Sequence, residues 1–201
     1  MVKAFSEKEK RYIRARLKDA AKECLGKFGV RKTTIDQLVE MTGISKGAFY
    51  KFYPSKEVLF FSVFEDYQNS IIGEVIERAF DKDTVTIEGF TELIYKIYND
   101  VGQSFIMNII KNQEFEYLIR KLPGELIIKH HSFDDILAQK IFSRLEIRDD
   151  TDIGVIAASL RAVFMCMLHI KEIGEKDFDR VLKLLIRGLV QQIVKGASSN
   201  E

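Results

Sequence analysis

The sequence predicts an all-α fold, with an N-terminal head of three helices followed by a C-terminal helical bundle. Apolar residues recur at helical spacing along most of the 201 residues. Only two prolines and twelve glycines interrupt the chain. No alternation of apolar and polar residues, the pattern of a half-buried strand, continues for more than four residues. These three observations together favour helices throughout.

Composition bounds the class of protein. With 46% hydrophobic and 30% charged residues, the chain can bury a sizeable core. Cys24 and Cys166 lack the spacing of a disulfide framework or a zinc knuckle, which favours a reducing, cytoplasmic setting. The charged N-terminus lacks the apolar region of a signal peptide, and no uninterrupted run of eighteen apolar residues occurs. We therefore expect no membrane segment.

Charge is distributed unevenly along the chain. Residues 1–56 hold 14 Lys and Arg against 6 Asp and Glu, whereas residues 57–201 hold 17 against 24. A basic end joined to an acidic remainder suits the binding of a polyanion. A basic helix lying on a membrane surface is the competing interpretation of the charge alone.

The first helix is expected from Ser6 to about Phe28, after a loose arm of residues 1–5. Ser6 and Glu9 have the spacing of a capping box. Gly29 is placed to end the helix in a left-handed conformation. Cys24 falls on the apolar face and is expected to be buried as a small hydrophobic residue.

Residues 33–57 are predicted to form two short helices around a glycine turn, then a stop and the start of a third helix, which is the spacing of a helix-turn-helix. Thr34 and Gln37 form a second capping box. Gly43 stands where the turn needs a positive φ, Ser45 can cap the next helix, and Pro54 ends it. In a helix-turn-helix the second helix lies in the DNA major groove, so this segment predicts DNA binding.

The second helix of this motif has one polar side. At helical spacing, Lys46, Tyr50 and Tyr53 lie together, with Gly47 and Lys51 beside them. Two amines, two phenols and a glycine that permits close approach suit phosphates and base edges. The alternative is the solvated face of an ordinary helix.

The motif resembles the DNA-binding signature of TetR-type transcriptional regulators. The residues that carry the resemblance are Thr34-x-x-x-Leu38-Val39-x-x-x-Gly43-Ile44-Ser45-Lys46-Gly47-Ala48-Phe49-Tyr50, then Ser55-Lys56-Glu57-x-Leu59. The family usually has Tyr or His, then Phe, where this chain has Phe52 and Tyr53. Phe52 cannot make the phosphate hydrogen bond of a Tyr or His, so Tyr53 or Lys51 would replace that contact.

The polar side of this helix and the resemblance together predict nine residues that contact DNA. Lys56 belongs to this set because a cation in the first turn of a helix opposes the helix dipole unless a phosphate binds there. The alternative is that Lys56 pairs with an acidic neighbour. The nine residues are Thr34, Ser45, Lys46, Gly47, Ala48, Tyr50, Lys51, Tyr53 and Lys56.

The remaining chain divides into further helices. The long one that follows Pro54 is expected to run to about Phe80, and the others span 86–101, 103–121, 132–146, 152–172 and 177–195. Residues 125–131 are either a short extra helix or a loop, and residues 196–201 are a tail. We predict a DNA-binding domain of residues 1–54 and a ligand-binding and dimerisation domain of residues 55–201.

The last two helices are apolar on two sides, so the second side needs a partner. A two-fold four-helix bundle made by this pair from each of two chains would cover it and would supply two heads for a palindromic site. The predicted interface residues are Ala158, Ala162, Met165, Leu168, Val181, Ile186, Val190 and Val194.

A small-molecule pocket in the body is implied by the resemblance, between the long linking helix and the helices that follow it. Such sites are mostly apolar, and the body is rich in aromatic residues. Tyr67, Tyr98, Phe105 and Asn108 are the lining residues that we single out. The expected ligand is small and apolar or amphipathic.

The predicted function is that of a dimeric transcriptional regulator, a repressor released from palindromic DNA by a ligand, without a cofactor or a metal. One alternative is a DNA-binding module without an inducer, whose body recruits another protein. Another is an all-α enzyme or metal sensor that uses His130, His131, Cys166 and His169. No glycine-rich phosphate loop, nucleophile elbow or zinc-protease motif occurs, which disfavours an enzyme.

Overall fold

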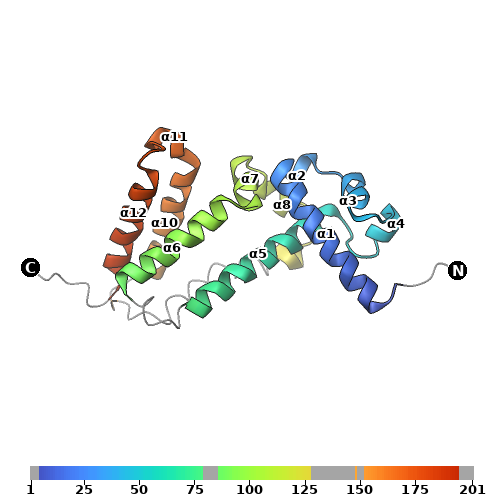
Figure 1. Ribbon diagram of the computed structural model, residues 1–201, viewed down its shortest axis with the longest axis horizontal. Helices are drawn as coiled ribbons and strands as arrows, with labels where there is room; N and C mark the ends of the chain where they lie inside the picture. Colours follow the sequence, from blue (N-terminus) through green and yellow to red (C-terminus); the bar gives the residue numbers. More distant parts are fainter. Residues whose placement is uncertain (1–4, 79–85, 128–147, 149–151, 195–201) are drawn as a thin grey trace, which may run out of the picture. The chain divides into compact units, whose positions relative to one another are not determined.

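The computed structural model describes residues 5–78, 86–127, 148 and 152–194 (Figure 1). The chain forms two compact units, each made from two stretches of sequence. Unit 1 comprises Met1–Asn69 with Gln103–Ile127, and unit 2 comprises Ser70–Gly102 with Ile128–Glu201. The elements are helices, as the all-α prediction requires.

Unit 1 contains the predicted head. Its helices are α1 (Glu7–Lys27), α2 (Gly29–Lys32), α3 (Ile35–Thr42), α4 (Lys46–Phe49), the first part of α5 (Lys56–Arg78), α7 (Phe105–Lys111) and α8 (Phe115–Arg120). Both predicted capping boxes are present, from Ser6 with Glu9 on α1 and from Thr34 with Gln37 on α3. The starts of these two helices are therefore set by local sequence.

Helix α2 was not predicted. Gly29 has a φ of +79° and follows the end of α1, as expected for a left-handed closing residue. The next residues do not form a plain connection, because Gly29–Lys32 make one further helical turn before α3. A single turn is too short to be stable by itself, so groups outside α2 must hold it.

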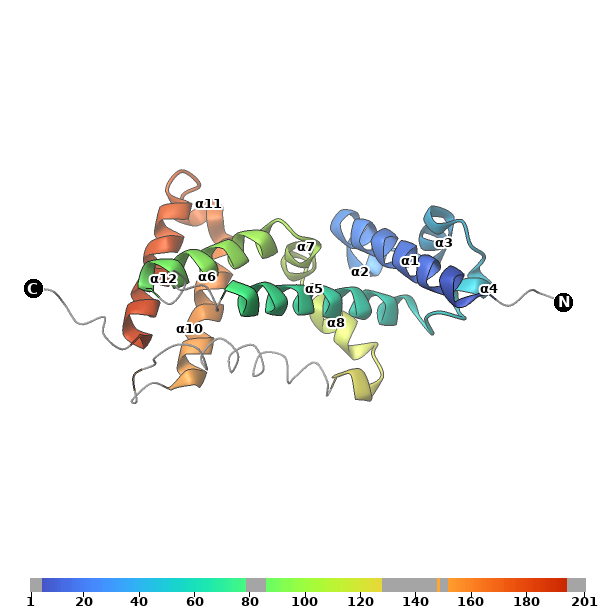
Figure 2. The ribbon, with the colours of Figure 1, turned by 60° about the horizontal axis from the view of Figure 1, so that its bottom comes forward.

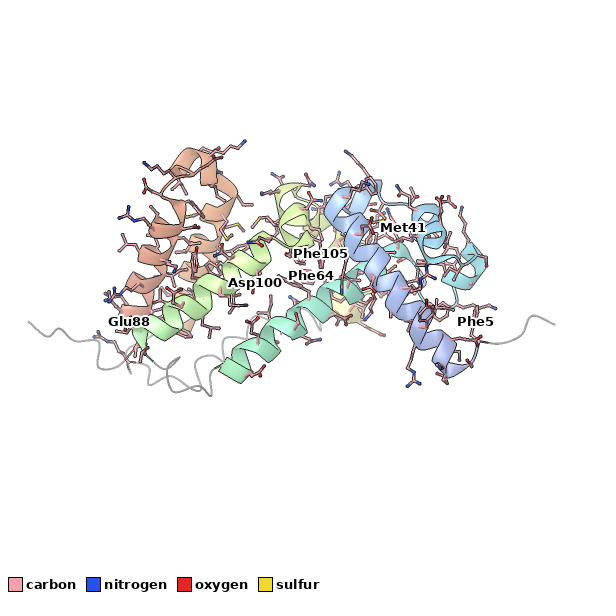
Figure 3. All side chains as sticks on the ribbon, in the orientation of Figure 1. Phe5, Met41, Phe64, Glu88, Asp100 and Phe105 are labelled. Carbon is pink, nitrogen blue, oxygen red and sulfur yellow. The ribbon has the colours of Figure 1, made fainter. Side chains whose placement is uncertain are left out.

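The core of unit 1 joins distant parts of the sequence. Fully buried apolar residues come from α1, α3, α4, α5, α7 and α8, and include Leu17, Leu25, Leu38, Phe49, Leu59, Phe60, Ile109 and Leu118. Helix α7 packs on α1, as Figure 2 also shows. Phe105 of α7 packs against this core (Figure 3). Because Ile109 of α7 and Leu118 of α8 are buried here, these two helices are part of the head's core. Burying each large apolar side chain stabilises the folded state by about 1.5–3 kcal/mol.

The predicted helix over residues 103–121 is broken into α7 and α8. Gln113, between the two, has a φ of +53°, a left-handed conformation that ends α7. The N–H of Glu114 donates to the carbonyl of Ile109 at 3.0 Å, and α8 begins at the next residue. Sequence periodicity continues through this bend, which is why the break was missed.

Unit 2 contains the later part of α5, α6 (Ile87–Gly102), α10 (Ile153–Met165), a 3₁₀ turn (Cys166–His169), α11 (Ile170–Ile173) and α12 (Phe178–Ile193). Helix α12 packs on α6 and α10. The predicted helix over 152–172 is thus interrupted by the 3₁₀ turn. Residues 124–127 are helical. The predicted helix over 132–146 and the predicted tail lie outside the described residues.

Replacing Gly43 by Ala is expected to lower the free energy of unfolding by about 1–2 kcal/mol, because its φ of +68° is a conformation that a Cβ opposes. No atom lies within 4 Å of an added Cβ, so the loss is conformational rather than steric. Gly73→Ala is the control, since Gly73 lies within α5 and is equally open. It should raise the free energy of unfolding in urea by about 0.5–1 kcal/mol. Changes of the same sign would contradict the prediction.

Candidate nucleic-acid interface

Helices α3 and α4 are held as a helix-turn-helix by backbone and cap hydrogen bonds. Gly43 ends α3 in the left-handed conformation, and the N–H of Ile44 donates to the carbonyl of Val39 at 3.1 Å. The Ser45 hydroxyl caps α4 by accepting from the N–H of Ala48 at 3.1 Å. The turn residues predicted from the sequence therefore occupy the positions expected of them.

Helix α4 has a buried side and an exposed side. Phe49 is fully buried, whereas Tyr50 is 54% exposed. Lys46, Gly47 and Lys51 are also exposed. These four residues lie on the predicted DNA-binding side, and Phe49 anchors the opposite side in the core of unit 1.

Gly47 does not serve the protein's own packing. A Cβ added at Gly47 would meet only the Ser45 hydroxyl, at 3.9 Å. No positive φ is recorded there. The missing side chain instead leaves a bare backbone on the exposed side of α4, where another molecule could approach closely.

Lys46 is paired with a residue that the sequence analysis did not single out. Its Nζ lies 2.7 Å from Oδ1 of Asp36, and both side chains are more than half exposed. The hydrogen bond and the charge of Asp36 raise the pKa of the Lys46 amine. An exposed ion pair of this kind is weak and can exchange for another anion. The sequence signal for this ion pair was Asp36 itself, an acidic residue in the first turn of α3 that comes shortly before the basic α4.

Thr34, Ser45 and Ala48 lie where helices begin. The Thr34 hydroxyl accepts from the N–H of Gln37 at 3.3 Å and lies 3.1 Å from Oε1 of Gln37. Thr34 and Ser45 thus have a structural role as caps, and Ala48 is half-buried. Their contacts with DNA stay a prediction.

Tyr53 does not lie on the exposed side. It is only 8% exposed, and its ring is 6.3 Å from that of Phe49. The prediction extended a helical face seven residues beyond Lys46, but α4 ends at Phe49. We therefore remove Tyr53 from the predicted DNA contacts and assign it to the core.

Lys56 is also not placed as predicted. Its Nζ donates to the carbonyl oxygens of Val30 at 2.9 Å, Arg31 at 3.3 Å and Thr33 at 2.6 Å. An ammonium group has three donors, so these bonds use all of them. The Lys56 amine therefore binds carbonyl oxygens at the end of α2. We correct the prediction that it binds a phosphate.

Phe52, the residue that departs from the family pattern, takes part in packing. Its ring lies 5.8 Å from the ring of Phe5 and 5.7 Å from the guanidinium of Arg14. Phe5 is thereby held near α4, and Nζ of Lys51 lies 6.0 Å from the Phe5 ring. Phe5 and Arg14 were not predicted, because contacts across the sequence leave no local pattern.

The four predicted pocket residues do not fall in one unit. Tyr67 and Phe105 are in unit 1 with rings 5.6 Å apart, and Asn108 of the same unit donates to the carbonyl of Leu25 at 2.7 Å. Tyr98 is in unit 2, where its hydroxyl donates to the carbonyl of Leu160 at 2.8 Å. Burial raises the pKa of the Tyr98 phenol.

A groove of about 360 Å³ is described on unit 2 between α6 and α12. Five of its seven lining residues are charged, and Lys183 and Arg187 of α12 pair with Glu92 and Glu88 of α6. None of the predicted pocket residues lines it. It is therefore not the apolar pocket expected from the sequence.

Helix α10 exposes an apolar side. Val155 is 61% and Met165 48% exposed. Ala158 and Ala162 are exposed between them, and Leu168 is half-buried. The α10 half of the predicted dimer face is therefore free of cover within the described chain.

The α12 half of the predicted dimer face needs correction. Ile186 and Val190 are fully buried in the chain's own core, while Val181 and Val194 are half-buried. The exposed apolar residues of α12 are instead Leu184, at 71%, and Leu185, at 41%. The sequence showed two apolar sides but not which one faced inward.

The stretch Gly154–Ile173 is long and apolar enough to cross a membrane by length and composition, and 6% of it is buried within the chain. Polar residues such as Arg161 and His169 interrupt it, so it contains no uninterrupted run of eighteen apolar residues. Arg161 lies within the stretch, and a charge there costs about 2.5–3.5 kcal/mol at the centre of a membrane. A 3₁₀ turn also interrupts it. Both features disfavour a membrane-spanning segment.

The residues suggested for a metal site are not gathered in the part of the chain that the structure describes. No group of three or more His, Cys, Asp or Glu residues able to hold a metal occurs there. The Cys166 thiol donates to the carbonyl of Ala162, and His169 lies 4.0 Å from Glu172. His130 and His131 lie outside the described residues.

Similar solved structures share this fold. FadR of Bacillus subtilis, solved in complex with stearoyl-CoA, matches at 18% identity with a TM-score of 0.67, over 89% of this chain and 98% of that chain. SmeT, the repressor of a Stenotrophomonas maltophilia multidrug efflux pump, matches at 17% identity with a TM-score of 0.63, over 92% and 93%. A TetR-family regulator from Cytophaga hutchinsonii matches at 20% identity with a TM-score of 0.61, over 96% and 99%. No curated protein matches the chain.

The sequence of the DNA-binding region identifies the family. Residues 17–63 match the model of bacterial regulatory proteins of the tetR family. The matched residues include all of α3 and α4 and most of the core that supports them. Residues 17–63 therefore form a DNA-binding region of the TetR type, and the chain as a whole shares the fold of these solved structures.

Proposed function

We propose that the chain is a dimeric cytoplasmic repressor that binds a palindromic DNA site through α3 and α4 and is released by a small ligand. The observation that carries the DNA contact is the exposure of Lys46, Gly47 and Tyr50 on one side of α4, opposite the buried Phe49. An amine, a bare backbone and a phenol suit phosphates and base edges in a major groove. Thr34, Ser45, Ala48 and Lys51 complete the proposed surface.

Two copies are needed to read a palindrome, with half-sites about 34–36 Å or a multiple apart. The exposed apolar side of α10, with Leu184 and Leu185 of α12, supports a second copy as the cover. Small residues such as Ala158 and Ala162 allow two helices to pack closely. We therefore propose that Leu184 and Leu185, rather than Ile186 and Val190, form the α12 part of the dimer interface.

Release by a ligand would follow from a population shift. A ligand that prefers a head separation mismatched to adjacent major grooves weakens DNA binding by its differential affinity for the two states. The structural neighbours FadR and SmeT were solved with stearoyl-CoA and with triclosan. These molecules support the proposal of an apolar or amphipathic ligand for this chain as well.

The DNA-binding surface is tested with a duplex that the wild-type protein selects from a randomised library. Lys46→Ala combined with Tyr50→Phe is expected to weaken binding by about tenfold. It should also reduce the slope of log affinity against log salt by about 1, because one phosphate contact is lost. Lys56→Met is the control. It should leave the salt slope unchanged and lower the free energy of unfolding by about 1–3 kcal/mol. A double variant that binds like wild type would refute the proposed surface.

Asp36→Asn is expected to strengthen binding to a duplex of random sequence by about twofold to fivefold. The carboxylate competes with phosphate for Lys46, 2.7 Å away, and its removal frees the amine. Fluorescence anisotropy with random and selected duplexes measures the effect. Asp36→Asn in a Lys46→Ala background should have a smaller effect on affinity. An equal effect in both backgrounds would show that Asp36 acts by general repulsion rather than through Lys46.

Ala162→Glu is expected to raise the dimer dissociation constant more than about tenfold, because it would bury an unpaired charge between two α10 helices. Sedimentation equilibrium of wild type and variant gives the constants. Gln103→Glu, at an exposed position of unit 1, should leave the dimer intact. A monomeric wild type that floats with lipid vesicles would instead assign the exposed side of α10 to a membrane.

A further inference from the structure

We propose that Glu114 is a positioning residue for the DNA-reading helices. Its carboxylate reaches from the junction of α7 and α8 to the start of α2, and so fixes where the chain enters α3. This inference rests on the proposed function and adds a residue that lies more than sixty positions beyond the helix-turn-helix in the sequence. The geometry at both ends of α2 carries it.

The N-terminal end of α2 is capped from outside. Oε2 of Glu114 accepts from the N–H of Val30 at 2.6 Å, and Oε1 accepts from the N–H of Arg31 at 3.2 Å. Phe28, the residue before α2, provides no side-chain cap. A negative charge at the start of a helix is favourable, and hydrogen bonds to a charged acceptor are stronger than neutral ones. Glu114 is only 6% exposed, so water does not weaken this contact.

Gly29 makes room for the carboxylate. A Cβ at this position would collide with Oε2 of Glu114, and the φ of +79° separately disfavours any other residue. The same glycine therefore ends α1 and permits the carboxylate to reach the first amides of α2.

The C-terminal end of α2 is held as firmly. Lys56 binds the carbonyls of Val30, Arg31 and Thr33, and the Thr33 hydroxyl donates to the carbonyl of Gly29 at 2.7 Å. Helix α3 begins at Ile35, directly after these bonds. Only Thr33 and Thr34 separate α2 from α3, so the position of α2 determines where α3 begins.

Glu114 is itself fixed in place. Its N–H donates to the carbonyl of Ile109, and its carbonyl accepts from the N–H of Leu118 at 2.9 Å. Ile109 and Leu118 are buried in the core of unit 1. The side chain of Asn108 adds a second polar bond, to the carbonyl of Leu25 at the end of α1. A shift of α7 and α8 along α1 would withdraw the carboxylate from both amides of α2 at once.

The test compares Glu114→Gln with two core variants, Ile109→Val and Ile109→Ala, which lower stability but keep the carboxylate that caps α2. Ile109 is 1% exposed, so a small and a large truncation of its side chain give melting temperatures on either side of that of Glu114→Gln. Each full-length protein is measured for its melting temperature, its affinity for the duplex selected by wild type, and hydrogen exchange of the Val30 and Arg31 amides.

Glu114→Gln is expected to bind the duplex at least about fivefold more weakly than an Ile109 variant of the same melting temperature. Its Val30 and Arg31 amides should exchange at least about tenfold faster, since a neutral amide is a weaker acceptor for both. Equal affinity at equal stability, or unchanged exchange, would overturn the positioning role. If wild type selects no duplex, the proposed function itself fails, and the positioning role fails with it. If only the positioning role of Glu114 is wrong, the wild-type protein still selects and binds a duplex.

Discussion

The burial of Phe49 in the core of unit 1 is the interaction on which the proposed DNA-binding surface depends. Helix α4 spans only Lys46–Phe49, far fewer residues than a helix needs to be stable in water. Its exposed side chains have defined positions only because Phe49 and Leu38 are fully buried together. The surface is therefore a consequence of the core beneath it.

Positive charge near the N-terminus is a poor guide to which residues face DNA. Several of the basic residues counted in residues 1–56 are used inside the chain: Lys18 pairs with Asp66, Lys46 with Asp36, and Lys56 with three carbonyls. Only Lys46 of these three combines exposure with a place on α4. Net charge thus indicates a polyanion-binding end, while the ion-pair partners decide which amines are available to it.

Local sequence predicted the head well where short-range chemistry decides the structure. The caps at Ser6 and Thr34 and the left-handed Gly43 each depend on residues within three or four positions, and all are present. Prediction failed where the answer depends on distant residues. Lys56 was assigned to phosphate because its carbonyl partners lie more than twenty positions away, and Ile186 to the dimer because periodicity cannot tell which of two apolar sides faces inward.

The conclusion that the chain is not an enzyme has a different basis. It follows from the match of residues 17–63 to a family of bacterial regulatory proteins rather than from any missing side chain. Under the proposed function, the body acts on DNA binding through contacts between side chains.

Those contacts begin inside unit 1. Residues 103–127 come after α6 in the sequence but belong to the same compact unit as the helix-turn-helix. Ile109 and Leu118 complete the core that holds α1 and Phe49, and Glu114 caps α2. Since packed interiors resist continuous deformation, a displacement of this segment cannot be absorbed locally and must either be resisted or move α2 and α3. Under the proposed function, a ligand that displaced α7 and α8 would therefore reach α3 through α2, without a contact to α4.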